Sequence, residues 1–149
     1  MATQNKYETI MLENQLCFPL YACAKEVVRQ YRKPLEDLNL TYTQYIVMMV
    51  LWEYGSMTEG ELGKRVHLDS GTLAPLLKRL EQQGDLNRKR PEGNERKLFL
   101  SLTQEGEALR DRALAVPGAM QGCLELSEAE LLQLKALLDK ALHRMKEKR

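Results

Sequence analysis

Residues 58–103 constrain the fold more than any other part of this sequence. Leucines in the middle of the stretch recur at intervals of three and four residues, which is the spacing of one buried face of an α-helix. They are Leu73, Leu76, Leu77 and Leu80. The pattern predicts a helix from about Asp69 to Gln83 that ends at Gly84, because glycine readily adopts the left-handed conformation that stops a helix. Thr58 and Glu61 form a capping box, which predicts a shorter helix just before it.

A β-hairpin is expected directly after these two helices. Two short runs, Leu86–Arg90 and Arg96–Leu102, flank the turn-forming sequence Pro-Glu-Gly-Asn at 91–94. The second helix offers N–H groups at its start and small or basic side chains on its exposed side, and both can contact DNA. The candidate DNA-binding residues are Ser70, Thr72, Lys78, Arg79, Arg88, Arg90 and Arg96. The other interpretation of these charges is an ordinary solvated surface.

The same stretch resembles the winged helix-turn-helix of the MarR family of bacterial repressors. The residues that carry the resemblance are the run from Leu68 to Gln82, the basic triplet Arg88-Lys89-Arg90, and the pairs Glu95-Arg96 and Leu102-Thr103. It implies that the chain binds double-stranded operator DNA, with helix 69–83 in the major groove and Arg96 in the minor groove. The family usually has an aspartate two residues before the wing-tip arginine, where this chain has Asn94. A neutral amide orients Arg96 less strongly than a carboxylate.

The composition limits the class of protein. The chain has 149 residues, which is enough for one compact domain. Its residues are 44% hydrophobic and 29% charged, a composition too charged for a membrane protein. Apolar runs fall short of the ~20 residues that cross a bilayer, and no signal peptide is evident, which predicts a cytoplasmic protein. The net charge is only +1, so DNA affinity must come from a local basic surface. No cofactor or metal is expected, because His67 and His143 have no recognised zinc spacing.

Cys17 is the candidate reactive residue. Asn14 can cap a helix that continues to about Arg32, which places Cys17 near the helix start. The positive end of the helix dipole favours a thiolate, and the thiolate is the form of cysteine that attacks a peroxide. The alternative is that Cys17, between Leu16 and Phe18, is a small buried core residue.

A second resemblance bears on this choice. The run from Leu12 to Tyr21, together with Tyr31 and the run from Thr41 to Tyr45, resembles the organic-hydroperoxide-sensing branch of the MarR family. The resemblance implies that Cys17 reacts with the peroxide and that Tyr31 and Tyr42 hydrogen-bond to it. It also implies that Cys123 is a resolving cysteine, which forms a disulfide with the oxidised Cys17 of the other subunit. Cys23 points to another side of the helix and is expected in the core.

The C-terminal residues predict a dimerisation helix. A capping box at Ser127 and Glu130 begins a helix with an apolar stripe, formed by Leu131, Leu134, Leu138, Ala141 and Met145. The stripe is too long for the small winged domain to cover, so a second copy of the chain is the expected partner. The alternative is a helix that folds back onto its own chain. Another helix should start at Thr103 and break at Pro117-Gly118.

The expected architecture is mainly α-helical (α+β), with a small β-hairpin wing. Residues 10–40 and 104–149 form a helical dimerisation region, and residues 41–103 form the winged helix-turn-helix DNA-binding region. Within the latter, residues 45–52 are all apolar or aromatic and predict a buried central helix.

The leading hypothesis is a homodimeric, redox-sensing repressor. It binds operator DNA when reduced and releases it when an organic hydroperoxide oxidises Cys17. One alternative is a MarR-type repressor that a phenolic or drug-like ligand releases from DNA. The other is a thiol peroxidase, against which stand the lack of a reductant site and the presence of DNA-reading residues that an enzyme would not need.

Overall fold

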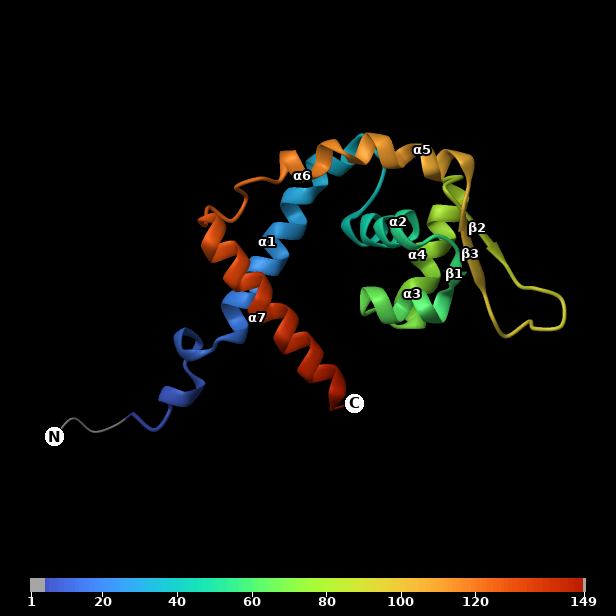
Figure 1. Cartoon of the computed structure of the whole chain (residues 1–149). Coiled ribbons are helices and arrows are strands. Elements are labelled where there is room, and N and C mark those ends of the chain that lie inside the picture. The colour runs from blue at the N-terminus through green and yellow to red at the C-terminus, as the bar shows by residue number, and fades with distance from the viewer. Residues whose placement is uncertain (1–4, 149) are drawn as a thin grey trace.

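The computed structural model describes residues 5–148 and is mainly α-helical (Figure 1). Two 3-10 turns, η1 (Glu8–Ile10) and η2 (Leu12–Asn14), precede the first helix. The helices are α1 (Cys17–Glu36), α2 (Tyr42–Tyr54), α3 (Glu59–Val66), α4 (Ser70–Gln82), α5 (Gln104–Ala113), α6 (Ala115–Ala119) and α7 (Glu128–Glu147). Strands β1 (Met57–Thr58), β2 (Leu86–Lys89) and β3 (Phe99–Leu102) form an antiparallel sheet in the order β1-β3-β2. This arrangement confirms the predicted winged helix-turn-helix.

Side-chain caps fix the starts of α3 and α4, the two helices of the helix-turn-helix. In α3, the Glu61 N–H donates to Thr58 Oγ1 at 3.2 Å, while Glu61 Oε2 accepts from the Thr58 N–H at 3.0 Å. Helix α4 is capped by Asp69, whose Oδ1 accepts from the Thr72 N–H at 2.8 Å. Each bond satisfies a backbone N–H that has no partner inside its helix. The positions of α3 and α4 therefore follow directly from the sequence.

Helix α1 differs from its prediction at both ends. It is preceded by Leu16, which makes no side-chain cap, and Asn14 instead donates its side-chain amide to the Glu8 carbonyl at 2.7 Å. The predicted Asn14 cap is therefore wrong, because η2 holds this residue in a separate turn. At the other end α1 runs through Pro34 to Glu36 rather than stopping near Arg32. A proline so close to the end removes one hydrogen bond without breaking the helix.

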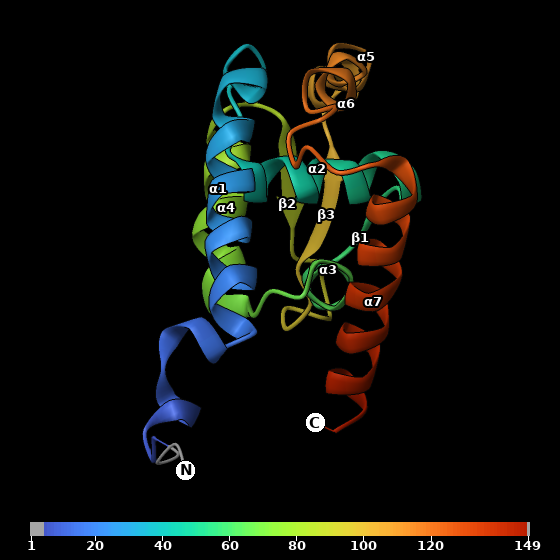
Figure 2. The same cartoon turned by 90° about the vertical axis from the view of Figure 1, so that its left-hand side faces the viewer.

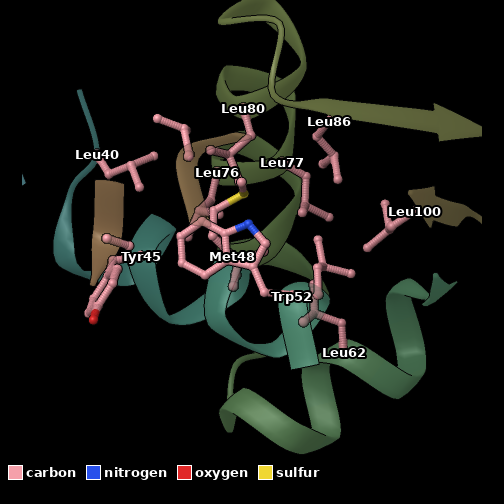
Figure 3. Close-up of a cluster of buried hydrophobic side chains, with 14 of the residues drawn as sticks. Leu40, Tyr45, Met48, Trp52, Leu62, Leu76, Leu77, Leu80, Leu86 and Leu100 are labelled. Atoms are coloured by element: carbon pink, nitrogen blue, oxygen red, sulfur yellow. The ribbon is translucent and has the colours of Figure 1, made fainter. Parts of the chain in front are cut away.

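The hydrophobic core is built around α2, which contacts α1, α3, α4, α5 and β3 (Figure 2). Met48 and Leu51 of α2 are fully buried against the leucine face of α4, and Figure 3 shows this cluster. Trp52 also fastens α2 to α5, because its Nε1 donates to the Gly106 carbonyl at 2.9 Å. The predicted buried central helix is confirmed for most of its residues, although Met49 is 37% exposed.

The wing strands are shorter than predicted. The sequence predicts strands that reach Arg90 and begin again at Arg96, whereas residues 90–98 form a loop between β2 and β3. Pro91 has no N–H to donate to a strand partner, and Gly93 has a positive φ of 84°. The basic residues of the wing tip are therefore carried on a loop rather than on paired strands.

Helix α7 has little contact with its own chain. None of its residues in 128–147 is buried, and Leu138 and Met145 of the apolar stripe are 37% and 65% exposed. It reaches the rest of the chain near its end, where Lys146 Nζ donates to the Lys64 carbonyl at 3.0 Å. The single chain thus leaves the stripe largely uncovered, and dimerisation through α7 stays a prediction.

The expected break at Pro117-Gly118 falls inside α6, which ends directly after it at Ala119. A first interruption comes earlier, at Leu114 between α5 and α6, where the backbone stays in the αR region and the side chain is 76% exposed. Within residues 5–148, no helix combines the length and the apolar character needed to cross a membrane.

Candidate DNA interface and redox site

Helix α4 presents its candidate DNA-binding side chains on the side opposite to its buried leucines. Ser70, Thr72, Lys78 and Arg79 are all exposed, while Leu73, Leu77 and Leu80 anchor the helix in the core. Small hydroxyl side chains lie at its first turn and two cations lie further along. This exposed side can enter a major groove, with the hydroxyls close to base edges and the cations near bases or phosphates.

The wing divides the remaining candidates into two groups. Arg90 and Arg96 are exposed on the loop between β2 and β3, where a DNA backbone or minor groove can reach them. Arg88 lies on β2 and is engaged within the protein, because its Nη2 lies 3.0 Å from Glu81 Oε1 of α4. Nothing in the run Arg88-Lys89-Arg90 distinguishes Arg88 from its basic neighbours.

A groove beside Arg79 extends the basic surface beyond the residues that the sequence singled out. Arg32 and Lys33 at the end of α1 line it, together with the start of α2 and the end of α4. Its lining also includes Glu36 and the buried amide of Gln44. The basic pair before Pro34 was the available signal, but only the fold brings it next to α4.

Three tyrosines form a cluster where α1 meets α2. The ring centroids of Tyr31 and Tyr42 are 4.6 Å apart, and those of Tyr31 and Tyr45 are 6.0 Å apart. Burial raises the pKa of all three phenols. Tyr42, Tyr45 and Cys123 raise the pKa of Tyr31 further. The phenols therefore stay protonated at neutral pH and can donate hydrogen bonds to an anion.

Cys123 follows α6, which packs against α1, the helix that carries Tyr31. It is partly exposed, in the segment between α6 and α7, and its charge is the last of the causes that raise the pKa of Tyr31. Of the four residues named for the redox site, the structure places Tyr31 and Tyr42 in contact.

Cys17 is far from these residues of its own chain. It is the first residue of α1, and Tyr31 follows 14 positions later in the same helix (31 − 17 = 14). At the rise of an α-helix this separates the two residues by roughly 21 Å. Cys17 is exposed, so it is not a core residue of its own chain. Cys23 is also exposed, and its predicted core position is wrong because this part of α1 lies outside the core.

The described part of the chain holds no cluster of metal-binding side chains. Among residues 5–148 no three His, Cys, Asp or Glu side chains are grouped so that they could hold a metal ion. His143 instead lies 3.2 Å from Glu147 on the exposed side of α7.

Comparison with known proteins identifies the family. The family model described as transcriptional regulator SarA/Rot matches residues 29–112. The organic hydroperoxide resistance transcriptional regulator of Bacillus subtilis is 44% identical over 145 residues, which cover 97% of this chain and 99% of that protein. The chain belongs to the MarR/SarA family of transcriptional regulators. It is thus a DNA-binding regulator and not an enzyme.

Solved structures of this MarR/SarA family share the fold. Reduced AbfR bound to DNA is 35% identical and matches with a TM-score of 0.75, covering 95% of this chain and 99% of that one. Disulfide-formed AbfR is 34% identical and matches with a TM-score of 0.60, covering 95% and 94%. AbfR comes from Staphylococcus epidermidis. The apo form of MarR from E. coli is 25% identical with a TM-score of 0.68, covering 86% and 97%.

Proposed function

We propose that this regulator is a cytoplasmic homodimeric repressor that senses organic hydroperoxides through Cys17. In this proposal the reduced dimer binds operator DNA, and oxidation of Cys17 releases it. The observation that carries the proposal is the exposed thiol at the first residue of α1, in a chain 44% identical to an organic hydroperoxide resistance regulator. Residues 10–40 and 104–149 form the dimerisation region, and residues 41–103 read the DNA.

The redox site is assembled from two chains. Within one chain, roughly 21 Å of rigid helix separates Cys17 from Tyr31, so these two residues cannot form a hydrogen bond. A two-fold dimer in which the two α1 helices pass each other brings Cys17 of one protomer to the tyrosines of its partner. The uncovered apolar residues of α1 and α7, such as Phe18, Leu20 and Leu138, support such an interface.

The reaction requires a thiolate and two proton donors. Cys17 reacts as the thiolate, and the phenols of the partner's Tyr31 and Tyr42 donate hydrogen bonds to its sulfur. The thiolate attacks the distal oxygen of the hydroperoxide, the O–O bond breaks, and the alkoxide leaves and takes up a proton as the alcohol. In this step the Cys17 sulfur loses two electrons and becomes a sulfenic acid, while the peroxide is reduced to the alcohol. The partner's Cys123 thiolate then attacks this sulfur, and hydroxide leaves as the disulfide forms.

A route from this site to the DNA runs through α2. Tyr42 and Tyr45 lie on α2, which also contacts α3 and α4, so a displacement of the tyrosines moves the helices that read the operator. The AbfR structures support a change of shape of this kind. This chain matches the reduced, DNA-bound form better than the disulfide form, with TM-scores of 0.75 and 0.60 at nearly equal identity and coverage.

The decisive experiment compares operator binding by wild type and by the Cys17→Ser variant, before and after cumene hydroperoxide. Two other outcomes would identify the alternatives. Release by a phenolic ligand without any oxidant, and unaffected by Cys17→Ser, would indicate a ligand-released repressor. Repeated consumption of peroxide with added thiol would indicate a thiol peroxidase.

The Cys123→Ser variant tests which thiol completes the oxidation. Treatment of wild type with one equivalent of hydroperoxide should produce a covalent dimer on a non-reducing gel, because the bridge joins different subunits. Cys123→Ser should remain monomeric on that gel, whereas Cys23→Ser should form the dimer as wild type does. If wild type forms no covalent dimer, Cys123 is not the resolving residue and a small cellular thiol takes its place.

A further inference from the structure

An ion pair joins the recognition helix to the wing. Glu81 Oε1 on α4 accepts from Arg88 Nη2 at 3.0 Å, and Glu81 Oε2 accepts from the Arg88 backbone N–H at 3.3 Å. The Glu81 side chain is 39% exposed and the Arg88 side chain 25% exposed, so solvent screens the pair only in part. The bonds from Arg88 lower the pKa of the Glu81 carboxyl, which is therefore ionised at neutral pH.

The position of β2 in the sheet explains why α4 supplies a carboxylate here. In the order β1-β3-β2, strand β2 lies at an edge, and its outward N–H groups have no neighbouring strand. Glu81 accepts from one of these groups and from the side chain of the same residue. A single carboxylate thus satisfies one N–H at the edge of the sheet and pairs with Arg88 Nη2, while the buried Arg88 Nε has no hydrogen-bond partner among the described residues.

A second contact extends this connection to the wing tip. Arg90 follows β2, and its Nη1 donates to the Glu95 carbonyl at 2.8 Å across the loop. Arg96, the candidate for the minor groove, is the next residue after Glu95. The Glu81–Arg88 pair and the Arg90–Glu95 hydrogen bond, which the backbone connects through Lys89, thus link α4 to the residue before Arg96.

We propose that Arg88 is a positioning residue, which with Glu81 fixes the wing relative to the recognition helix. The pair thereby sets the spacing between the major-groove side chains of α4 and Arg96 in the minor groove. A wing held in this way before binding loses less conformational freedom when it meets the DNA. The inference rests on DNA binding by the winged fold and is independent of the redox step.

The competing role for Arg88 is a direct phosphate contact, and electrostatics separate the two roles. If Arg88 contacts phosphate, neutralising the nearby Glu81 removes a repulsive charge and strengthens DNA binding. If Arg88 acts through Glu81, the same neutralisation loosens the wing and weakens operator binding. The two roles thus predict effects of opposite sign for Glu81→Gln.

The test measures the affinity of reduced protein for a duplex that wild type has selected from a random-sequence pool, at several salt concentrations. Glu81→Gln and Arg88→Lys should each weaken binding by about tenfold, since each breaks a charge-assisted hydrogen bond. The double variant should be no weaker than either single variant, because both changes remove the same interaction. The dependence on salt should stay unchanged. Glu92→Gln, which removes an exposed carboxylate from the wing loop, is the matched control and should not weaken binding.

Two results would overturn the proposal. The first is that Glu81→Gln binds DNA as tightly as wild type or more tightly, while Arg88→Gln lowers the slope of log affinity against log salt concentration by about 0.9. Together these would make Arg88 a phosphate contact. Equal losses on the selected duplex and on an unselected duplex would make the pair a general support of the fold rather than of DNA reading. Since the protein is kept reduced, neither result bears on peroxide sensing.

Discussion

The Cys17→Ser variant should remain bound to operator DNA in the presence of cumene hydroperoxide, under conditions in which wild type is released. Serine keeps the size of the side chain at the first residue of α1 but cannot be oxidised by a peroxide. For wild type we expect affinity to fall by more than a hundredfold. That loss corresponds to a preference of about 3 kcal/mol for the released conformation, which is within the usual range of coupling between two sites. Fluorescence anisotropy with a labelled operator duplex measures both affinities.

Two kinds of variant serve as controls for this result. Cys23→Ser changes an exposed thiol on the same helix, and it should be released as readily as wild type. Tyr31→Phe and Tyr42→Phe should bind DNA normally but react more slowly with peroxide, because each removes one phenol that would stabilise the thiolate of the partner's Cys17. If Cys17→Ser is released as readily as wild type, Cys17 is not the sensor.

The helix-turn-helix could be predicted largely from local patterns. The leucines at 73, 76, 77 and 80 are all buried, and the capping boxes at Thr58 and Ser127 form as expected. These features depend on residues at most four positions apart along one helix, and local spacing therefore determines them. Asn14 failed as a cap because a competing turn at η2 uses its side chain, and a helix pattern does not reveal that turn.

Contacts between distant segments could not be predicted in this way. The pairing of Arg88 with Glu81 depends on how β2 packs against α4. The basic run 88–90 therefore does not reveal that Arg88 alone forms an ion pair with α4. The electrostatic influence of Cys123 on Tyr31 likewise joins residues 92 positions apart (123 − 31 = 92). Cys23 is exposed because most of α1 lies outside the core of its own chain, and only Leu35 near its end is buried.

The Gly106→Ala variant should be markedly less stable than wild type, although alanine is normally the better residue inside a helix. A Cβ at position 106 would lie 2.1 Å from the Asp85 carbonyl oxygen, which is backbone and cannot swing aside. Alanine would ordinarily contribute up to ~1 kcal/mol to a helix. Overpacking of about 1–3 kcal/mol or more exceeds this gain, because so short a contact forces α5 away from the turn before β2.

Trp52 reports the same displacement directly. It is the only tryptophan of the chain, and its Nε1 donates to the carbonyl of Gly106. If α5 shifts, this buried hydrogen bond breaks, and tryptophan emission should move to longer wavelength in the folded variant while the thermal midpoint falls. Gly118→Ala is the matched control, because a Cβ there meets nothing within 4 Å, and it should equal or exceed wild type in stability. Both midpoints must be compared at one protomer concentration, since a dimer gains stability with concentration. A Gly106→Ala protein with wild-type midpoint and emission would show that α5 does not pack tightly on the turn at Asp85.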